Sequence, residues 1–423
     1  MENKFKKDHV INKDSSVFIA TFSLYEKGRR LPKNGMVEPM LSFFVPKVKT
    51  LLLLDQPHLT SDTINPFIEK YENGKLIEKY RLSAFIYFPI YLYCLMERSG
   101  LTRISHKLRD FFSVIFIGLT QKDKYELFIG LEAVNAIAGI ILRKIGKVET
   151  VVYYVSDYSP NRFSKFGRKR LNSLYLWLDR FCVEHADFTW DVSSAMQKGR
   201  LKNGLNPKRK YRVINAANGL FPSQIKSLPI SQRIPYSLVY LGTLGSDFGV
   251  ELAIEAFKEV KSKYKKAILR IIGGGKELPI LNRLVRKLEL EKSVIFYGYI
   301  EDNNEAARIV RTSYIGLAPY RAFPESIRWY GDAGKIRQYV ASGLPVVTTH
   351  VPPLGKYIVE KGAGIMTKDT VESFSNGIVK LLSDDELYIK LSVAAEKISK
   401  DNTWENVYTK AFNDMEAIIN SRL

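Results

Sequence analysis

The chain has 423 residues, of which 46% are hydrophobic, and this length and composition are typical of two globular domains. Its two cysteines, Cys94 and Cys182, exclude a disulfide framework, and its five histidines show no zinc-site spacing. Lys and Arg (64 residues) outnumber Asp and Glu (44 residues), and the resulting formal charge of +20 indicates an anionic partner.

The N-terminal region carries no pattern of a secretory signal. Residues 1–7 are charged, and no apolar segment of the signal-peptide type follows them. The longest apolar stretch, residues 82–96, is too short to span a membrane and contains Pro89. We therefore expect a cytoplasmic protein, with peripheral attachment to the inner face of the membrane as an alternative.

Apolar strands alternate with amphipathic helices along the first half of the chain. Short apolar runs predict strands, and an apolar period near 3.6 residues predicts helices. The expected strands are residues 17–22, 50–54, 127–130, 151–155, 188–192 and 213–215, and the expected helices are residues 133–142 and 168–185.

The same alternation restarts after a segment rich in proline and serine, residues 218–233, which we interpret as a linker. The expected strands are residues 237–241, 267–272, 294–297, 315–319 and 346–348, and the expected helices are residues 250–263, 279–288, 304–313, 371–383 and 404–419, together with one that ends at Gly343. This series predicts an α/β protein with two doubly wound parallel sheets, in domains 1–228 and 229–403, followed by a C-terminal helix in residues 404–423.

The helix before Gly343 is a candidate anion site. Gly343 can end the helix in a left-handed cap, and Pro345 leads directly into an apolar strand. Lys335 and Gln338 stand near the helix N-terminus, where backbone N–H groups favour anions. The pattern therefore predicts a phosphate-bearing ligand, and the alternative is an ordinary helix-to-strand turn.

Two glycine-rich loops follow strands of the second half. Gly242 and Gly245 flank Thr243 in the first loop, and Gly274 lies in the second. Glycines at the carboxyl ends of parallel strands let the backbone approach a ligand such as a diphosphate. Tight structural turns are the alternative for both loops.

Charged and aromatic side chains gather in residues 321–330, between an expected strand and the helix that ends at Gly343. Arg321, Glu325 and Arg328 are the charged members of this loop. Because loops that follow strands carry function more often than they carry the core, we expect ligand binding here rather than a solvated loop.

In the first half, Glu132 and Asp157 each follow an expected strand. Either carboxylate could act as a general base or orient a hydroxyl group. The alternatives are a solvated first-turn residue for Glu132 and a helix cap for Asp157.

The basic runs 165–170 and 200–212 lie in the first half and favour an anionic membrane surface. A solvated charged face is the alternative. Nucleic acid is not favoured, because no recognisable module interleaves aromatic residues with the basic ones.

Six pieces of the second half occur in an order that is typical of one protein family. They are residues 240–244, 249–257, 269–275, 294–299, 335–347 and 404–405. Together they resemble the GT-B glycosyltransferases of the family-4 type, the group 1 transferases; the first half is similar only near residues 187–193 and 218–219. The resemblance implies two Rossmann-like domains that face each other across a cleft, with the last helix crossing back to the first domain.

The same resemblance implies a hexosyltransferase-like enzyme that moves a sugar from a nucleotide sugar, with retention of configuration and without a bound metal or cofactor. The donor would bind the second domain, where Lys335 with Arg321 or Arg328 would meet the diphosphate and Gln338 would hold the ribose. A glycan or lipid-linked acceptor would bind the first domain near Glu132 and Asp157. Cell-surface glycan assembly is the expected setting.

The sequence departs from the family at several positions. The family usually has arginine where Thr243 stands, lysine where Phe248 stands and glutamate where Gln338 stands. It often has histidine where Ser156 stands, and Tyr330 occupies the expected position of a further glutamate. These departures motivate an alternative, a catalytically degenerate protein that serves as a binding or scaffold subunit. A polyanion-binding protein is a third hypothesis, motivated by charge alone.

Overall fold

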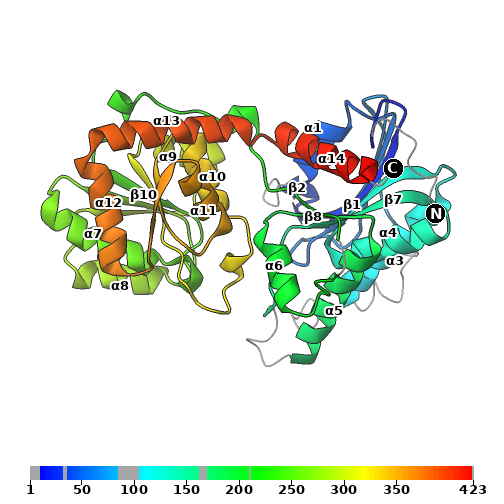
Figure 1. Ribbon diagram of the computed structural model, residues 1–423, viewed down its shortest axis with the longest axis horizontal. Coiled ribbons are helices and arrows are strands. Elements are labelled where there is room, and N and C mark those ends of the chain that lie inside the picture. The colour runs from blue at the N-terminus through cyan, green and yellow to red at the C-terminus, as the bar shows by residue number, and fades with distance from the viewer. Residues whose placement is uncertain (1–9, 32–35, 84–103, 162–168, 209–210, 422–423) are drawn as a thin grey trace. The chain divides into compact units, whose positions relative to one another are not determined.

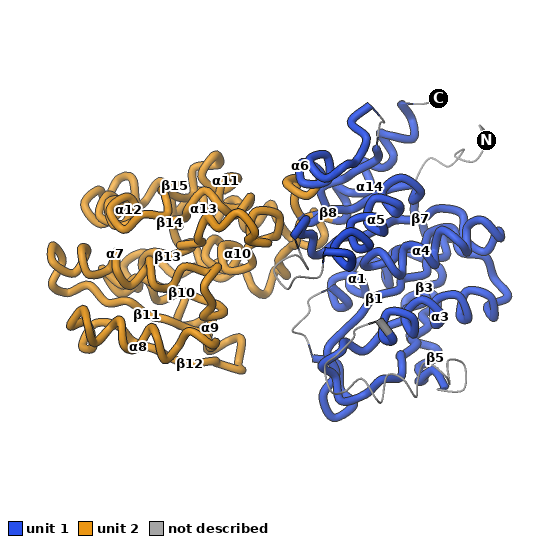
Figure 2. Tube along the Cα trace, turned by 90° about the horizontal axis from the view of Figure 1, so that it is seen from below, with its two compact units in different colours: residues 1–192, 197–216, 408–423 blue, residues 193–196, 217–407 orange. Residues whose placement is uncertain are grey.

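The computed structural model describes residues 10–31, 36–83, 104–161, 169–208 and 211–421. The chain forms two compact units, drawn in Figures 1 and 2. Unit 1 comprises residues 1–192, 197–216 and 408–423, and unit 2 comprises residues 193–196 and 217–407. Contacts therefore place residues 217–228 in unit 2, whereas we expected them at the end of the first domain.

Unit 1 is built on a mixed sheet that, in the described part of the chain, has nine strands in the order β5-β4-β3-β1-β6-β7-β8-β9, with β2 paired to β1. The six strands from β3 to β9 along this order are parallel, and β2, β4 and β5 pair antiparallel. The strands are β1 Ser16–Glu26, β2 Arg29–Leu31, β3 Thr50–Pro57, β4 Phe67–Glu72, β5 Lys75–Arg81, β6 Tyr125–Leu131, β7 Val148–Val155, β8 Phe188–Asp191 and β9 Val213–Asn215.

Helices cover both faces of this sheet (Figure 1). Helices α3, α4 and α5 lie on one face, and α1 and α14 lie on the other. The bounds are α1 Val37–Phe44, α3 Ile104–Thr120, α4 Glu132–Lys144, α5 Lys169–His185, α6 Ala195–Lys202 and α14 Trp404–Asn420.

The last helix, α14, belongs to unit 1 from Tyr408 onward, although the preceding helix belongs to unit 2. The ring of Phe412 stacks on Phe43 of α1, with centroids 5.8 Å apart, and meets Trp190 of β8 edge-on at 5.3 Å. Aromatic burial thus fixes the end of the chain to the first sheet. This arrangement confirms the expected return of the C-terminal helix.

Unit 2 has an all-parallel sheet with the order β12-β11-β10-β13-β14-β15. The strands are β10 Ser237–Leu241, β11 Ile268–Ile272, β12 Val294–Gly298, β13 Ile315–Ala318, β14 Val346–Thr349 and β15 Gly364–Thr367. The helices are α7 Val250–Lys263, α8 Leu278–Lys287, α9 Asn303–Arg311, α10 Gly334–Ala341, α11 Pro353–Glu360, α12 Val371–Ser383 and α13 Asp385–Asp401.

Two apolar clusters sandwich this sheet. One joins the strands to α7, α8 and α12, and the other joins them to α9, α10, α11 and α13. Strand order reverses between β10 and β13, because the chain winds outward from β10 in one direction and from β13 in the other. Such a switch point is where open parallel sheets bind ligands.

Several elements of the structure were not expected from the sequence. Strands β4 and β5 extend the edge of the first sheet, and every residue of β5 is exposed, so no apolar face marks it. Helix α3 buries Arg109 and Asp110 as well as Val114 and Ile117, and it exposes Leu108 and Phe112, so its apolar residues do not define the buried face. The remaining unexpected elements are β2, β15, α1, α6, α11 and α13.

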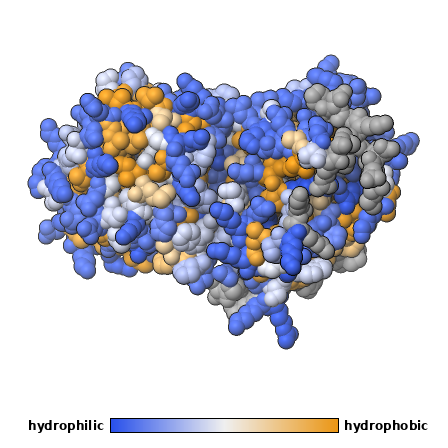
Figure 3. Space-filling model, in the orientation of Figure 1, coloured by the Kyte–Doolittle hydropathy of each residue, from blue (hydrophilic) through white to orange (hydrophobic). Residues whose placement is uncertain are grey.

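Hydrophilic residues predominate on the face drawn in Figure 3, with hydrophobic residues in separate patches. In the described part of the chain, no helix combines the length and apolar content needed to cross a bilayer. Residue 168, expected at the start of the helix that is observed as α5, and Cys94 lie outside the described residues.

Helix α10 packs so closely on β13 that a methyl group between them should cost stability. A Cβ atom added at Gly316 of β13 would lie 2.4 Å from Cγ of Tyr339. We expect Gly316→Ala to lower the free energy of unfolding by about 1–3 kcal/mol, the usual cost of overpacking. Gly334→Ala is the matched control, since a Cβ there meets no atom within 4 Å. Equal thermal midpoints for the two variants would contradict this packing.

Candidate functional site

A pocket of about 520 Å³ opens at the carboxyl edge of the second sheet, at the switch point between β10 and β13. Segments that follow the four strands β10, β11, β12 and β13 form its walls together with the first turns of α10. The lining residues are Leu241, Gly242, Thr243, Phe248, Ile272, Gly273, Gly274, Tyr299, Ile300, Asn303, Ala306, Tyr320, Arg328, Asp332, Gly334, Lys335 and Gln338.

The turns after β10 and β11 are locked to each other through their backbones. The amide of Gly242 donates to the carbonyl of Ile272 at 2.9 Å, and the amide of Leu244 donates to Gly274 at 3.0 Å. Gly273 has a φ of 140°, and a Cβ there would lie 1.9 Å from the carbonyl oxygen of Gly242. Only glycine fits at this position, so bare backbone forms this side of the pocket.

Lys335 is the buried cation of the site. Its residue is 8% exposed, and its Nζ has no hydrogen-bond partner among the described residues. The ammonium instead lies 3.7 Å from the ring centroid of Tyr240 and 4.9 Å from that of Tyr320. The side chain passes over Gly242, where an added Cβ would lie 3.3 Å from Cε of Lys335. The aromatic faces offset part of the cost of burying the charge.

Burial lowers the pKa of Lys335 well below its usual value of 10.5, and the nearby charge of Arg328 lowers it further. The carboxylate that lines the same pocket does not neutralise it, because Asp332 pairs with Arg337 at 2.9 Å and accepts the amide of Asn218 at 3.1 Å. The pocket therefore holds positive charge that an incoming anion would compensate.

Arg328 supplies the second cation. Its guanidinium carbon lies 4.4 Å from the ring centroid of Phe248, and its Nε is buried without a hydrogen-bond partner in the described structure. Phe248 stands where the resembling family usually has a lysine. Here the aromatic ring supports a cation that comes from a different loop.

Of the residues proposed for the donor, the structure brings Gly242, Thr243, Gly274, Arg328, Lys335 and Gln338 to the pocket wall. Three others do not line it. Arg321 donates from Nη1 to the carbonyl of Asp369 at 3.0 Å, and its Nε lies 3.6 Å from Oε1 of Glu251. Glu325 is exposed on its loop, and Gly245 precedes a short 3-10 turn.

Tyr339 positions the helix that carries Lys335. Its buried hydroxyl accepts the amide of Leu241 at 2.8 Å and donates to the carbonyl of Leu317 at 3.0 Å. One side chain thus ties α10 to both strands of the switch point. The sequence alone did not predict this role for Tyr339.

The polar lining residues of the pocket that the sequence did not predict are Asp332, Tyr299, Asn303 and Tyr320. Tyr320 could have been predicted as a pocket residue, since it directly follows the strand expected over residues 315–319. Tyr299 and Asn303 come from the segment after β12, and no local motif distinguishes them from a solvated loop.

In unit 1, the two carboxylates proposed from the sequence lie beyond neighbouring parallel strands. Glu132 directly follows β6, and Asp157 lies two residues beyond β7. Oε1 of Glu132 accepts a hydrogen bond of 2.7 Å from the hydroxyl of Ser156. The carboxyl edge of the first sheet therefore also presents polar side chains.

Residues 235–384 match the family model described as Glycosyl transferases group 1. An uncharacterized glycosyltransferase of Haemophilus influenzae is 25% identical over 173 residues, which are 40% of this chain and 46% of that protein. The matched region thus spans less than half the length of this curated relative.

Two solved structures resemble the whole chain. Sucrose-phosphate synthase from Thermosynechococcus elongatus aligns with a TM-score of 0.67 at 13% identity, over 96% of this chain and 100% of that one. HepE of Anabaena, solved in complex with UDP, aligns with a TM-score of 0.62 at 15% identity, also over 96% and 100%. The fold is GT-B, as the sequence resemblance implied.

The unpaired Lys335 makes the stability of the protein depend on pH. Burial lowers the pKa of Lys335 in the folded protein, so the unfolded chain binds more protons between that pKa and 10.5. The free-energy cost of burying the charge is therefore complete below the folded pKa and is lost as the pH rises towards 10.5. We expect Lys335→Met to raise the thermal midpoint at pH 7, with a gain that shrinks as the pH rises towards 10.5. Melting curves across this range test it, with the exposed Lys356→Met as control. A midpoint lowered at pH 7 would contradict the assignment.

Proposed function

We propose that this chain, whose residues 235–384 match the group 1 glycosyltransferases and whose fold is GT-B, transfers a sugar from a nucleotide sugar. The acceptor is a glycan or a lipid-linked sugar of cell-surface assembly, and the anomeric configuration is retained. The observation that carries the proposal is the buried, unpaired ammonium of Lys335 at the switch point of a parallel sheet.

Lys335 and Arg328 would bind the diphosphate of the donor. Both face the pocket, and neither is neutralised there by a carboxylate in the described structure. When the glycosidic bond breaks, negative charge grows on the leaving diphosphate, and fixed cations in a partly dry site stabilise it. In this metal-independent reaction, Lys335 and Arg328 supply the positive charge that stabilises the leaving diphosphate.

Gln338 would hold the nucleotide ribose. Its side chain is exposed at the pocket wall, on the same helix as Lys335. An amide oxygen accepts a ribose hydroxyl, but more weakly than the carboxylate usual in the family. The complex of HepE with UDP supports a uridine diphosphate as the first nucleotide to test.

The acceptor would bind unit 1 at the carboxyl edge of its sheet, near Glu132 and Asp157. The formal charge of +20 supports attraction to an anionic membrane surface, where lipid-linked acceptors are found. We place the enzyme at the cytoplasmic face of that membrane, as a peripheral protein.

A second candidate function, a binding or scaffold subunit without turnover, is favoured by Thr243 and Gln338, which replace the family's charged residues. Release of UDP from UDP-sugars by the isolated protein distinguishes the two functions. Sustained turnover that is lost in Lys335→Met contradicts the scaffold, and nucleotide binding without any turnover supports it.

Nucleotide binding should depend on the pocket cations. We expect Lys335→Met and Arg328→Gln each to weaken UDP binding by about 10–100-fold, because a hydrogen bond to a charged group contributes about 1.5–3 kcal/mol. Arg321→Gln is the matched control and should bind normally, because its guanidinium contacts Asp369 and Glu251. Calorimetric titration with UDP, ADP and GDP measures this. The donor site is wrong if none binds, or if Lys335→Met binds as the native protein does.

Binding should also take up a proton. A bound anion raises the lowered pKa of Lys335, so the fraction that is neutral in the free protein becomes protonated. We expect this uptake at pH values between the lowered pKa of Lys335 and 10.5, and it is measured above about pH 8, where a diphosphate is already fully ionised. Titrations in two buffers of different ionisation enthalpy count the protons. Uptake that is equally large in Lys335→Met would contradict this role.

A further inference from the structure

Glu132 has a left-handed backbone conformation, with a φ of 65°, that glycine adopts freely and a glutamate adopts only with strain. The other four described non-glycine residues with positive φ lie in turns or at the ends of elements: Lys27 and Asn73 each precede a glycine in a hairpin turn, Tyr236 directly precedes β10, and Glu289 lies two residues after α8. Glu132 instead stands where β6 ends at Leu131 and α4 begins, with no connecting residue between them. Such strain persists when the surroundings enforce it, and it gathers at functional sites.

Close packing of α4 on β6 enforces this turn. A Cβ atom at Gly130 would lie 2.7 Å from the amide nitrogen of Ala136, and a Cβ at Gly139 would lie 2.3 Å from Cδ1 of Phe128. The helix therefore lies directly against the strand that precedes it. A longer loop would lift the helix, so the chain reverses within one residue, as in other strained strand-to-helix elbows.

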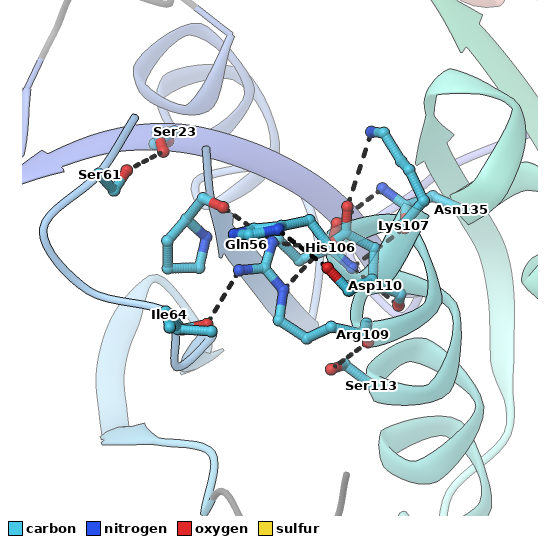
Figure 4. Close-up of polar contacts among 12 residues, drawn as sticks. Ser23, Gln56, Ser61, Ile64, His106, Lys107, Arg109, Asp110, Ser113 and Asn135 are labelled. Carbon is cyan, nitrogen blue, oxygen red and sulfur yellow. Dashed lines mark hydrogen bonds and ion pairs between the residues drawn. The ribbon is translucent and has the colours of Figure 1, made fainter. Parts of the chain in front are cut away.

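A buried pair of amides, Gln56 and Asn135, holds the elbow in place, and Figure 4 shows these two side chains together. Nδ2 of Asn135 donates to the carbonyl of Leu131 at 2.9 Å and to Oε1 of Gln56 at 3.0 Å. Nε2 of Gln56 donates in return to Oδ1 of Asn135, and also to the carbonyl of Asp110, each at 3.0 Å. Gln56 is 0% exposed and Asn135 is 3% exposed, so these bonds are shielded from water.

The elbow directs the Glu132 carboxylate to the hydroxyl of Ser156, 2.7 Å from Oε1. Leu131 pairs with Tyr154 across β6 and β7, which sets both polar residues at the carboxyl edge of adjacent strands. Both side chains are partly exposed there. The carboxylate accepts hydrogen bonds, and the hydroxyl both donates and accepts them. Together they can bind the hydroxyl groups of a sugar.

We propose that the β6–α4 elbow is a preformed hydroxyl-binding site in which Glu132, held by Ser156, the buried Gln56–Asn135 pair and backbone strain, receives a hydroxyl of a carbohydrate acceptor. This inference rests on the proposed function for the identity of the ligand. The strain itself is independent of that function. A structural carboxylate would gain nothing from a backbone conformation that costs stability, whereas a binding carboxylate gains orientation before the ligand arrives.

Backbone strain is tested first, without any ligand. Glu132→Gly should raise the thermal midpoint by about 1–3 °C, because glycine relieves the left-handed cost. Glu149→Gly, at an exposed position of β7, should lower it, because glycine weakens a strand. A midpoint lowered as much by Glu132→Gly as by Glu149→Gly would overturn the elbow as a strained site.

Hydroxyl binding is tested by saturation-transfer NMR with methyl α-glucopyranoside, methyl α-mannopyranoside and methyl β-galactopyranoside. We expect the native protein to bind at least one of them, and Glu132→Gln and Ser156→Ala to weaken that binding at least tenfold. Glu149→Gln should bind as the native protein does. Binding of none of the three sugars, or equal binding by Glu132→Gln, would overturn the proposal.

A UDP titration of each variant separates this inference from the proposed function. All Glu132 and Ser156 variants should bind UDP with native affinity, because the donor residues belong to unit 2. If UDP does not bind the native protein but a methyl glycoside binds through Glu132, the donor assignment fails and the hydroxyl site stands. If UDP binds and the glycosides do not, the hydroxyl site fails alone.

Discussion

A lysine buried without a carboxylate lowers the stability of the protein that contains it, and the architecture of unit 2 is arranged to hold one. Lys335 is carried by a helix that Tyr339 ties to both β10 and β13. Its ammonium rests on aromatic faces, chiefly that of Tyr240, and its alkyl chain needs the absent side chain of Gly242. Bound anion would recover the lost free energy, so the cost of the apo state becomes affinity for the ligand.

The two units present polar groups at the carboxyl edges of their sheets in opposite ways. In unit 2, Gly242 and Gly273 take positive φ, so bare backbone lines one side of the pocket, and the charged side chains come from α10 and the loop of Arg328. In unit 1, a glutamate occupies the positive-φ position, and the strain serves to place its carboxylate. The first arrangement suits a polyanion, and the second suits a neutral molecule rich in hydroxyl groups.

The sequence predicted most of the parallel strands of both sheets, because buried parallel strands are continuous apolar runs. It missed β4 and β5, where antiparallel pairing at the sheet edge stabilises a segment with little apolar pattern. It missed α3 because Arg109, which donates to the carbonyls of Pro57 and Ile64, is buried in the same helix as Val114 and Ile117, so polar and apolar residues mix on the buried face. The pattern of neighbouring residues does not reveal partners that lie far away in the sequence.

By itself, the sequence determined the α/β alternation, the glycines at strand ends and a lysine at the start of the helix before Gly343, since each depends on residues close in the chain. Only the tertiary structure decided which of the two arginines, Arg321 or Arg328, lines the pocket. The two lie in one loop with the same charge, but Arg321 is held by Asp369 and Glu251, whereas Arg328 rests on Phe248 at the pocket. The strain at Glu132 was equally invisible, because it arises from a helix pressed onto its own strand through Gly130 and Gly139. Both outcomes depend on contacts among side chains and backbone that only the folded chain brings together.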